Sequence, residues 1–275
     1  MRRTVVVVGV LLSLVFLAGG GYAIGATPGL LGSPQQGAVV RPGVSETPDE
    51  PSRSPGPSPS PSPSPTVDPP VIDDATRGGP YGSVDVTGSE AVALTFDDGP
   101  HPVWTPKVLA KLRESGVTAT FCVIGRQARQ YPELIREIVA DGHTLCNHSW
   151  NHEFDLGKQS RAAIAKNLKR TNAAIRAAVP DARIGYFRQP GGEWTKRVIS
   201  VSEKLGMAPV HWSVDPSDWN SERKATQINK QVVGDVEAGD IVLMHDGGGD
   251  RARTLKALSP ILSDLSSRFI LIGLP

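Results

Sequence analysis

The sequence has little cysteine, no charge excess and no phosphate-binding glycine motif. Its two cysteines are too few for a disulfide scaffold or a four-cysteine zinc site. The 29 basic and 28 acidic residues give a net charge of +1, which excludes the strongly basic surface that binds nucleic acid through its phosphates. No G-x-G-x-x-G sequence follows the first apolar segment of the domain, so nothing supports dinucleotide binding. The near-neutral balance suits an uncharged substrate and predicts no nucleic-acid partner.

Aromatic residues are absent from residues 27–80, and the stretch from Ser54 to Pro65 reads SPGPSPSPSPSP. Proline at alternate positions prevents helices and sheet ladders and favours extended polyproline II. With so little apolar surface to bury, nothing offsets the entropy cost of ordering this segment. We therefore predict a disordered, semi-rigid Pro/Ser-rich linker over residues 27–80.

Residues 1–26 are typical of an export signal. Arg2 and Arg3 precede an apolar run from Val5 to Ala18, and small residues follow as far as Ala26. Residues 4–26 are also long enough to cross a bilayer, so a cleaved signal peptide and a retained membrane anchor with its basic end inside both remain open. Either alternative places the rest of the protein outside the cytoplasm, secreted or tethered to the membrane.

From residue 92 onward, short apolar segments alternate with segments of helical periodicity. This alternation predicts parallel strands joined by right-handed helical crossovers. We expect one α/β domain over residues 81–275, an irregular (β/α) barrel with about seven parallel strands, with an open doubly wound sheet as the alternative. The expected strands cover residues 92–96, 117–124, 143–147, 183–187, 208–214, 240–245 and 268–273.

Polar residues cluster where these predicted strands end. Because the carboxyl ends of parallel strands meet on one face, we expect the clusters to form one site. His148 and His152 are four residues apart, which would bring two imidazoles together on one helical turn, a spacing that suits a metal; the adjacent pair Asp97-Asp98 can supply a third ligand. The other aspartate then stays free to accept a proton. Ser149 stands where a zincin protease has its glutamate, which argues against proteolysis.

Five segments together resemble the five ordered motifs of the polysaccharide deacetylases (the NodB-homology domain, carbohydrate esterase family 4). The resemblance covers about residues 88 to 275, and all five motifs occur in order. They are Thr95-Phe96-Asp97-Asp98-Gly99-Pro100, His148-Ser149-x-x-His152, Arg188-x-Pro190-Gly191-Gly192, Asp215-x-x-Asp218-Trp219 and Leu243-x-His245-Asp246.

The resemblance implies a distorted (β/α) barrel that binds a divalent metal, usually zinc, with Co²⁺, Ni²⁺ or Mn²⁺ as alternatives. It makes Asp98, His148 and His152 the metal ligands. It also makes Asp97 the general base and His245 the general acid.

The same resemblance assigns supporting roles to five further residues. Arg188 would hold Asp97, and Asp215 would orient His245. The backbone N–H of Gly191 would stabilise the oxyanion, while Trp219 and Leu243 would line the acetyl pocket. Many members of the family have an aromatic residue where Gly191 stands, so we expect a more open substrate groove here.

These observations predict a metal-dependent hydrolase that removes acetyl groups from N-acetylglucosamine in a polymer. An exported domain on a long spacer favours peptidoglycan as the substrate, with chitooligosaccharides and acetylxylan as alternatives. An inactive carbohydrate-binding module is the alternative from another functional class. We expect a monomer. Cys122 and Cys146 fall on neighbouring strands, where a disulfide and two buried thiols are both allowed.

Overall fold

The computed structural model describes residues 74–275, so the predicted signal or anchor and the linker up to residue 73 lie outside the described residues. In this part of the chain the strands form a single sheet with the order β5-β4-β3-β2-β1-β6, and β7 pairs with β1. Every neighbouring pair is parallel. The strands are β1 (Val92–Asp97), β2 (Thr120–Val123), β3 (Thr144–Asn147), β4 (Ile184–Phe187), β5 (Ala208–Pro209), β6 (Ile241–His245) and β7 (Leu271–Ile272).

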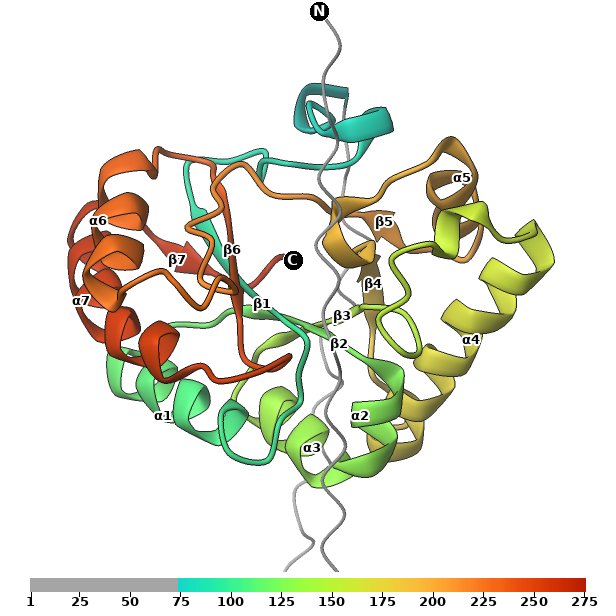
Figure 1. Cartoon of the computed structure of the whole chain (residues 1–275), viewed down its shortest axis with the longest axis horizontal. Coiled ribbons are helices and arrows are strands. Elements are labelled where there is room, and N and C mark those ends of the chain that lie inside the picture. The colour runs from blue at the N-terminus through green and yellow to red at the C-terminus, as the bar shows by residue number, and fades with distance from the viewer. Residues whose placement is uncertain (1–73) are drawn as a thin grey trace, which may run out of the picture. The chain divides into compact units, whose positions relative to one another are not determined.

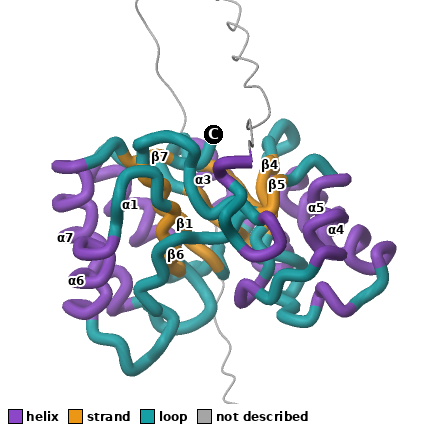
Figure 2. The backbone as a smooth tube through the Cα atoms, turned by 90° about the horizontal axis from the view of Figure 1, so that it is seen from above, coloured by secondary structure: helices purple, strands orange, loops and turns teal. Residues whose placement is uncertain are grey.

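Helices surround the curled sheet, with α6 and α7 on one flank and α4 and α5 on the other (Figures 1 and 2). All but α2 follow the predicted alternation; α2 is too short and too polar to show a clear apolar period. The helices are α1 (Thr105–Ser115), α2 (Gly125–Gln130), α3 (Pro132–Ala140), α4 (Arg161–Ala178), α5 (Lys196–Lys204), α6 (Ala225–Asp235) and α7 (Ala252–Arg268). Four short 3-10 turns complete the elements of residues 74–275: η1 (Asp74–Thr76), η2 (Pro80–Gly82), η3 (Leu156–Lys158) and η4 (Pro190–Gly192).

The barrel closes only through isolated bridges, which confirms the predicted irregular parallel (β/α) architecture. Val214, beyond the end of β5, pairs in parallel with Val242 of β6, and Leu243 N donates to Val214 O at 2.9 Å. The strand predicted over residues 208–214 is thus reduced to a two-residue β5 followed by single bridges. Pro209 contributes to this because it lacks the N–H that a continuing ladder needs.

Alternation along the strands separates two layers of side chains. In β1, Val92, Leu94 and Phe96 belong to the large core packed against the helices, whereas Ala93 belongs to a smaller cluster with Cys122 and other residues of the sheet. A period of two therefore puts Thr95 and Asp97 on the face of β1 opposite the large core. Asp97 therefore lies at the carboxyl end of β1, on the face of the sheet opposite the large core.

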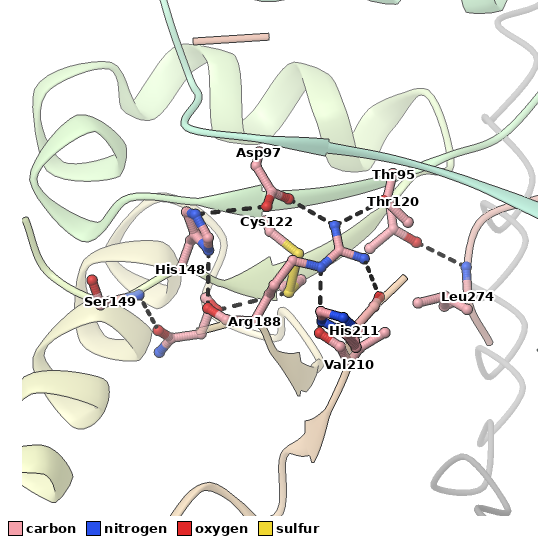
Figure 3. The surroundings of a disulfide bond; sticks show 12 residues. Thr95, Asp97, Thr120, Cys122, His148, Ser149, Arg188, Val210, His211 and Leu274 are labelled. Carbon is pink, nitrogen blue, oxygen red and sulfur yellow. Dashed lines mark hydrogen bonds and ion pairs between the residues drawn. A yellow bond between two sulfur atoms is a disulfide. The ribbon is translucent and has the colours of Figure 1, made fainter. Parts of the chain in front are cut away.

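Cys122 and Cys146 form a disulfide, which decides between the two alternatives left open by the sequence (Figure 3). They are register partners on β2 and β3, with their Cα atoms 4.1 Å apart. Cys122 is also the register partner of Asp97 on β1. The cross-link therefore joins the strands next to the predicted site.

Replacing both cysteines, Cys122→Ala with Cys146→Ala, is expected to lower the free energy of unfolding by about 3 kcal/mol, because the bond closes a loop spanning 24 residues. Urea denaturation of the oxidised wild type and the double variant measures the difference. Reduced wild type serves as the matched control and should resemble the variant. Two titratable thiols in the native wild-type protein would contradict the assigned bond.

Residues 74–80, which the sequence assigns to the linker, contact the domain. Arg77 Nη1 lies 3.0 Å from Glu203 Oε1, and Asp85 N donates to Thr76 O at 3.1 Å. These contacts join the segment that begins at Asp74 to the rest of the domain. Among the helices of residues 74–275, none has the length and apolar character needed to cross a membrane.

Candidate active site

The sheet register brings the ends of β1 and β6 together. Asp97 and His245 are the last residues of these strands and are Cα partners. His148 and Arg188 directly follow β3 and β4, and Arg188 N donates to Asn147 O at 3.0 Å. All the predicted site residues except Arg188 line one cavity of about 690 Å³, hereafter the catalytic cavity. Arg188 lies fully buried behind it.

Three side chains in this cavity converge as metal ligands would. The ligand atoms of Asp98, His148 and His152 all lie within 4.8 Å of one another. Asp98 Oδ1 is 3.1 Å from His152 Nε2 and 3.5 Å from His148 Nε2, yet this buried oxygen accepts no hydrogen bond. His148 Nδ1 donates to Arg188 O at 2.9 Å, which leaves Nε2 as the unprotonated nitrogen. One carboxylate oxygen and two imidazole nitrogens that converge in this way fit a divalent metal such as zinc.

The electrostatics of the cluster favour an ionised Asp98 and a neutral His152. Burial acts to raise the pKa of Asp98, but His148, His245 and His152 outweigh it and hold that pKa well below its ordinary value. Burial, with His148 beside it, lowers the pKa of His152. An ionised carboxylate beside a neutral imidazole is the donor pair that a metal requires.

The backbone around the cluster adopts conformations that are uncommon outside glycine. Asp98 has φ 74° and His152 has φ 60°. Such left-handed residues are disfavoured and are held by their surroundings, often at functional sites. A Cβ at Gly248 would collide with the Asp98 carboxylate, so the loop after β6 must have glycine there.

Arg188 fixes one oxygen of Asp97 (Figure 3). Its Nη1 donates to Asp97 Oδ1 at 2.8 Å and to Thr95 Oγ1 at 2.7 Å, while Nη2 donates to His211 O at 2.9 Å. The other oxygen, Asp97 Oδ2, lies 3.6 Å from His148 Nε2. Arg188 therefore holds Oδ1 of Asp97, while Oδ2 faces the cluster of predicted metal ligands.

Asp218, rather than Asp215, contacts His245, so the expectation from the family resemblance is wrong at this position. His245 Nδ1 lies 2.7 Å from Asp218 Oδ1, and Asp218 Oδ2 accepts from His245 N at 3.0 Å and from Thr254 Oγ1 at 2.7 Å. Asp215 Oδ1 instead accepts from Ser217 N at 2.7 Å, and the residue lies on the cavity wall. Both aspartates belong to one motif, and residue type alone does not separate them.

Asp218 also controls the charge state of His245. Burial acts to lower the pKa of His245, but the charge of Asp218 and the hydrogen bond to it outweigh burial and raise that pKa to about 9. Asp98 and Asp97 add to the increase. His245 therefore carries a proton at neutral pH.

Two further residues support the site without a predicted role. Asp246 is fully buried, accepts a hydrogen bond from Thr105 Oγ1, and donates from its backbone N to Asp97 O at 3.1 Å. Burial raises the pKa of Asp246 to about 7, against the lowering effect of the Thr105 hydrogen bond. Arg251 donates to Gly247 O at 2.6 Å. Asp246 ends one of the five motifs, which indicates a role for it, whereas no sequence signal marks Arg251.

Comparison with known proteins identifies the family. The family model described as polysaccharide deacetylase matches residues 85–210. A chitooligosaccharide deacetylase from Sinorhizobium fredii is 42% identical over 200 residues, which cover 69% of this chain and 92% of that protein. The chain belongs to the polysaccharide deacetylase family.

Other members of this deacetylase family act on a different glycan or have known structures. A peptidoglycan-N-acetylglucosamine deacetylase from Bacillus cereus is 35% identical over 187 residues, covering 66% of this chain and 86% of that protein. The structure of a family 4 carbohydrate esterase from Streptomyces lividans in complex with acetate superposes with a TM-score of 0.61 at 34% identity, covering 68% of this chain and 93% of that one. These matches confirm the carbohydrate esterase family 4 resemblance and a hydrolase that acts on amide bonds in polysaccharide.

Proposed function

We propose that this deacetylase is metal-dependent, acts outside the cytoplasm and removes acetyl groups from the N-acetylglucosamine residues of a cell-wall glycan, peptidoglycan first. One arrangement carries the proposal: Asp97 and His245 lie in the same cavity as the converging ligand atoms of Asp98, His148 and His152. A free carboxylate and a protonated imidazole beside a cation site are the groups that amide hydrolysis needs.

Asp98, His148 and His152 would hold the divalent metal, with zinc as the first candidate and Co²⁺, Ni²⁺ or Mn²⁺ as alternatives. When bound, such a metal supplies Lewis acidity toward the acetyl carbonyl oxygen and makes water more acidic. The three residues leave room for exchangeable ligands, as catalytic sites do and closed structural sites do not.

The remaining residues divide the proton transfers between them. Asp97, with Oδ1 held by Arg188, accepts a proton at Oδ2 as water adds to the amide carbon. Protonated His245 then donates its Nε2 proton to the departing nitrogen as the carbon–nitrogen bond breaks, giving acetate and a free amine. The Gly191 backbone N–H, on the cavity wall, would stabilise the developing oxyanion.

Trp219 and Leu243 bound the space for the acetyl group. Both line the catalytic cavity, Leu243 as a buried residue and Trp219 with 55% of its surface exposed. A small apolar wall accepts a methyl group and leaves a larger acyl group without space.

Two observations support a location outside the cytoplasm. The basic and apolar pattern of residues 1–26 is that of a secretory signal or anchor. The disulfide between Cys122 and Cys146 is a bond that persists in oxidising compartments. An exported domain behind a proline-rich spacer meets wall glycan first, which favours peptidoglycan. The 42% identity to a chitooligosaccharide deacetylase favours chitooligosaccharides as the second candidate.

Acetate release from purified peptidoglycan, chitooligosaccharides and acetylxylan, with metal supplied, tests the proposal. We expect release from the two N-acetylglucosamine polymers, greatest from peptidoglycan, and none with Asp97→Asn as the matched inactive control. Release only from acetylxylan would contradict the substrate class. No release from any of the three would indicate an inactive carbohydrate-binding module.

A further inference from the structure

Phe154 stands at the mouth of the catalytic cavity, two residues after His152. Its side chain is 57% exposed, although phenylalanine is usually buried. Its ring meets the His152 ring edge-on, with the centroids 4.6 Å apart and the planes at 88°. An exposed aromatic ring is thus fixed directly beside a predicted metal ligand.

The ring occupies the space that a side chain at position 191 would need. Gly191 has φ 62°, and a Cβ built there would lie 2.6 Å from both Cδ1 and Cε1 of Phe154. The family resemblance predicts a more open groove at Gly191, because many members of the family have an aromatic residue there. The structure instead fills this place with an aromatic ring from the loop after β3, so the groove wall is aromatic.

Gln189, the residue between Arg188 and Pro190, holds the loop that carries Phe154. Gln189 is fully buried, and its Nε2 donates to Phe154 O at 3.2 Å and to Glu153 O at 3.1 Å. Residues 188–191 therefore have three roles: Arg188 holds Asp97, Gln189 holds the Phe154 backbone, and Gly191 leaves space for the Phe154 ring. Such a fixed ring binds a ligand with little loss of entropy.

Phe154 also separates the catalytic cavity from a second cavity of about 370 Å³. Among the described residues that line these two cavities, Phe154 is the one they share. The other residues around the second cavity offer hydrogen-bonding groups of both charges beside a buried indole; they are Asp155, Gly157, Lys158, Glu193, Trp194 and Thr195. Hydroxyl groups need such donors and acceptors, while the apolar face of a sugar ring packs on an aromatic side chain.

We propose that Phe154 determines specificity for oligomeric glycans: the chain crosses its ring, with the reacting sugar in the catalytic cavity and a neighbouring sugar in the second cavity. This inference rests on the proposed function and assigns the residue that binds the glycan chain beyond the reacting sugar. A monosaccharide would reach the metal ligands but would leave the second cavity empty.

Phe154→Ala, assayed on N-acetylglucosamine and on chitotriose and chitopentaose, tests the inference. We expect kcat/KM of the wild type to rise with chain length. In Phe154→Ala, KM for chitopentaose should rise about tenfold, the size of a lost aromatic contact, while kcat stays within about twofold. The monosaccharide should be used equally by both proteins, and bound metal per chain should be unchanged. Phe154→Trp, which keeps a flat ring, should preserve the length dependence.

Two control variants separate this role from a general effect. Tyr81→Ala removes an aromatic side chain that is also 57% exposed but lines neither cavity, and should match the wild type on every substrate. Lys158→Ala removes a group that lines only the second cavity and should raise KM for chitotriose and chitopentaose but not for N-acetylglucosamine.

The two hypotheses fail in different ways. If the wild type releases acetate but Phe154→Ala shows the same KM at every chain length, the role of Phe154 is wrong and the proposed function stands. If the wild type releases no acetate, the proposed function fails, and calorimetric binding of chitopentaose to the metal-free proteins still decides the role of Phe154. Weaker binding by Phe154→Ala than by Tyr81→Ala then supports it, and equal binding overturns it.

Discussion

Asp97→Asn is expected to keep the bound metal and to lower the rate of acetate release by a factor on the order of 10² to 10⁴. The amide that replaces the carboxylate still accepts the hydrogen bond from Arg188 Nη1, so the local structure should persist. It no longer accepts a proton from the attacking water. The three converging ligand atoms of Asp98, His148 and His152 are untouched by the change. Elemental analysis of metal per chain and an acetate assay with metal in excess measure the two effects.

Asp98→Asn is the matched control because it makes the same chemical change one residue away. It removes the only carboxylate of the ligand cluster, and a neutral amide oxygen binds a divalent cation more weakly. We expect metal content to fall, with activity partly recovered as metal is added. His148→Ala should behave in the same way. A metal-free Asp97→Asn beside a loaded Asp98→Asn would reverse the two assignments.

The sequence predicts the architecture well where the strand pattern is strong. Residues 92–97 and 241–245 are buried and mostly apolar, with turn residues beyond them, and they become the two longest strands of the sheet, β1 and β6. The pattern fails at β5, where Pro209 interrupts the ladder and isolated bridges replace a continuous strand. Helix α2 is missed because six residues do not establish a helical period.

The sequence likewise predicts the site residues that strand pairing positions, but not the contacts that depend on irregular loops. Asp97 ends β1, and Asp98, His148 and Arg188 directly follow strands, so parallel pairing places them together. His152 reaches the cluster differently, through the loop after β3, which is not helical. The choice between Asp215 and Asp218 depends instead on the path of an irregular loop, which no periodic pattern describes. The place of Phe154 is set by a missing side chain at Gly191 in a distant segment, a contact that residue spacing does not reveal.

Asp218→Asn is expected to lower acetate release at neutral pH by a factor on the order of 10², and to move the alkaline limit of activity to lower pH. His245 acts as an acid, so activity falls as pH rises through its pKa. Asp218 raises that pKa to about 9 against the effect of burial. Removing the negative charge lowers the pKa, and His245 then loses its proton earlier as the pH increases.

The pH dependence of kcat distinguishes this role from a purely structural one. Asp215→Asn is the matched control, since Asp215 bonds Ser217 N and is not among the groups that shift the pKa of His245. The alkaline limb of the pH profile of Asp215→Asn should lie at the same pH as that of the wild type, even if the absolute rate changes. His245→Ala should lower activity at every pH and leave metal content unchanged. The residue that sets the pKa of His245 must move the alkaline limb of the pH profile when its charge is removed. An alkaline limb that shifts in Asp215→Asn but not in Asp218→Asn would therefore restore Asp215 as the residue that orients His245.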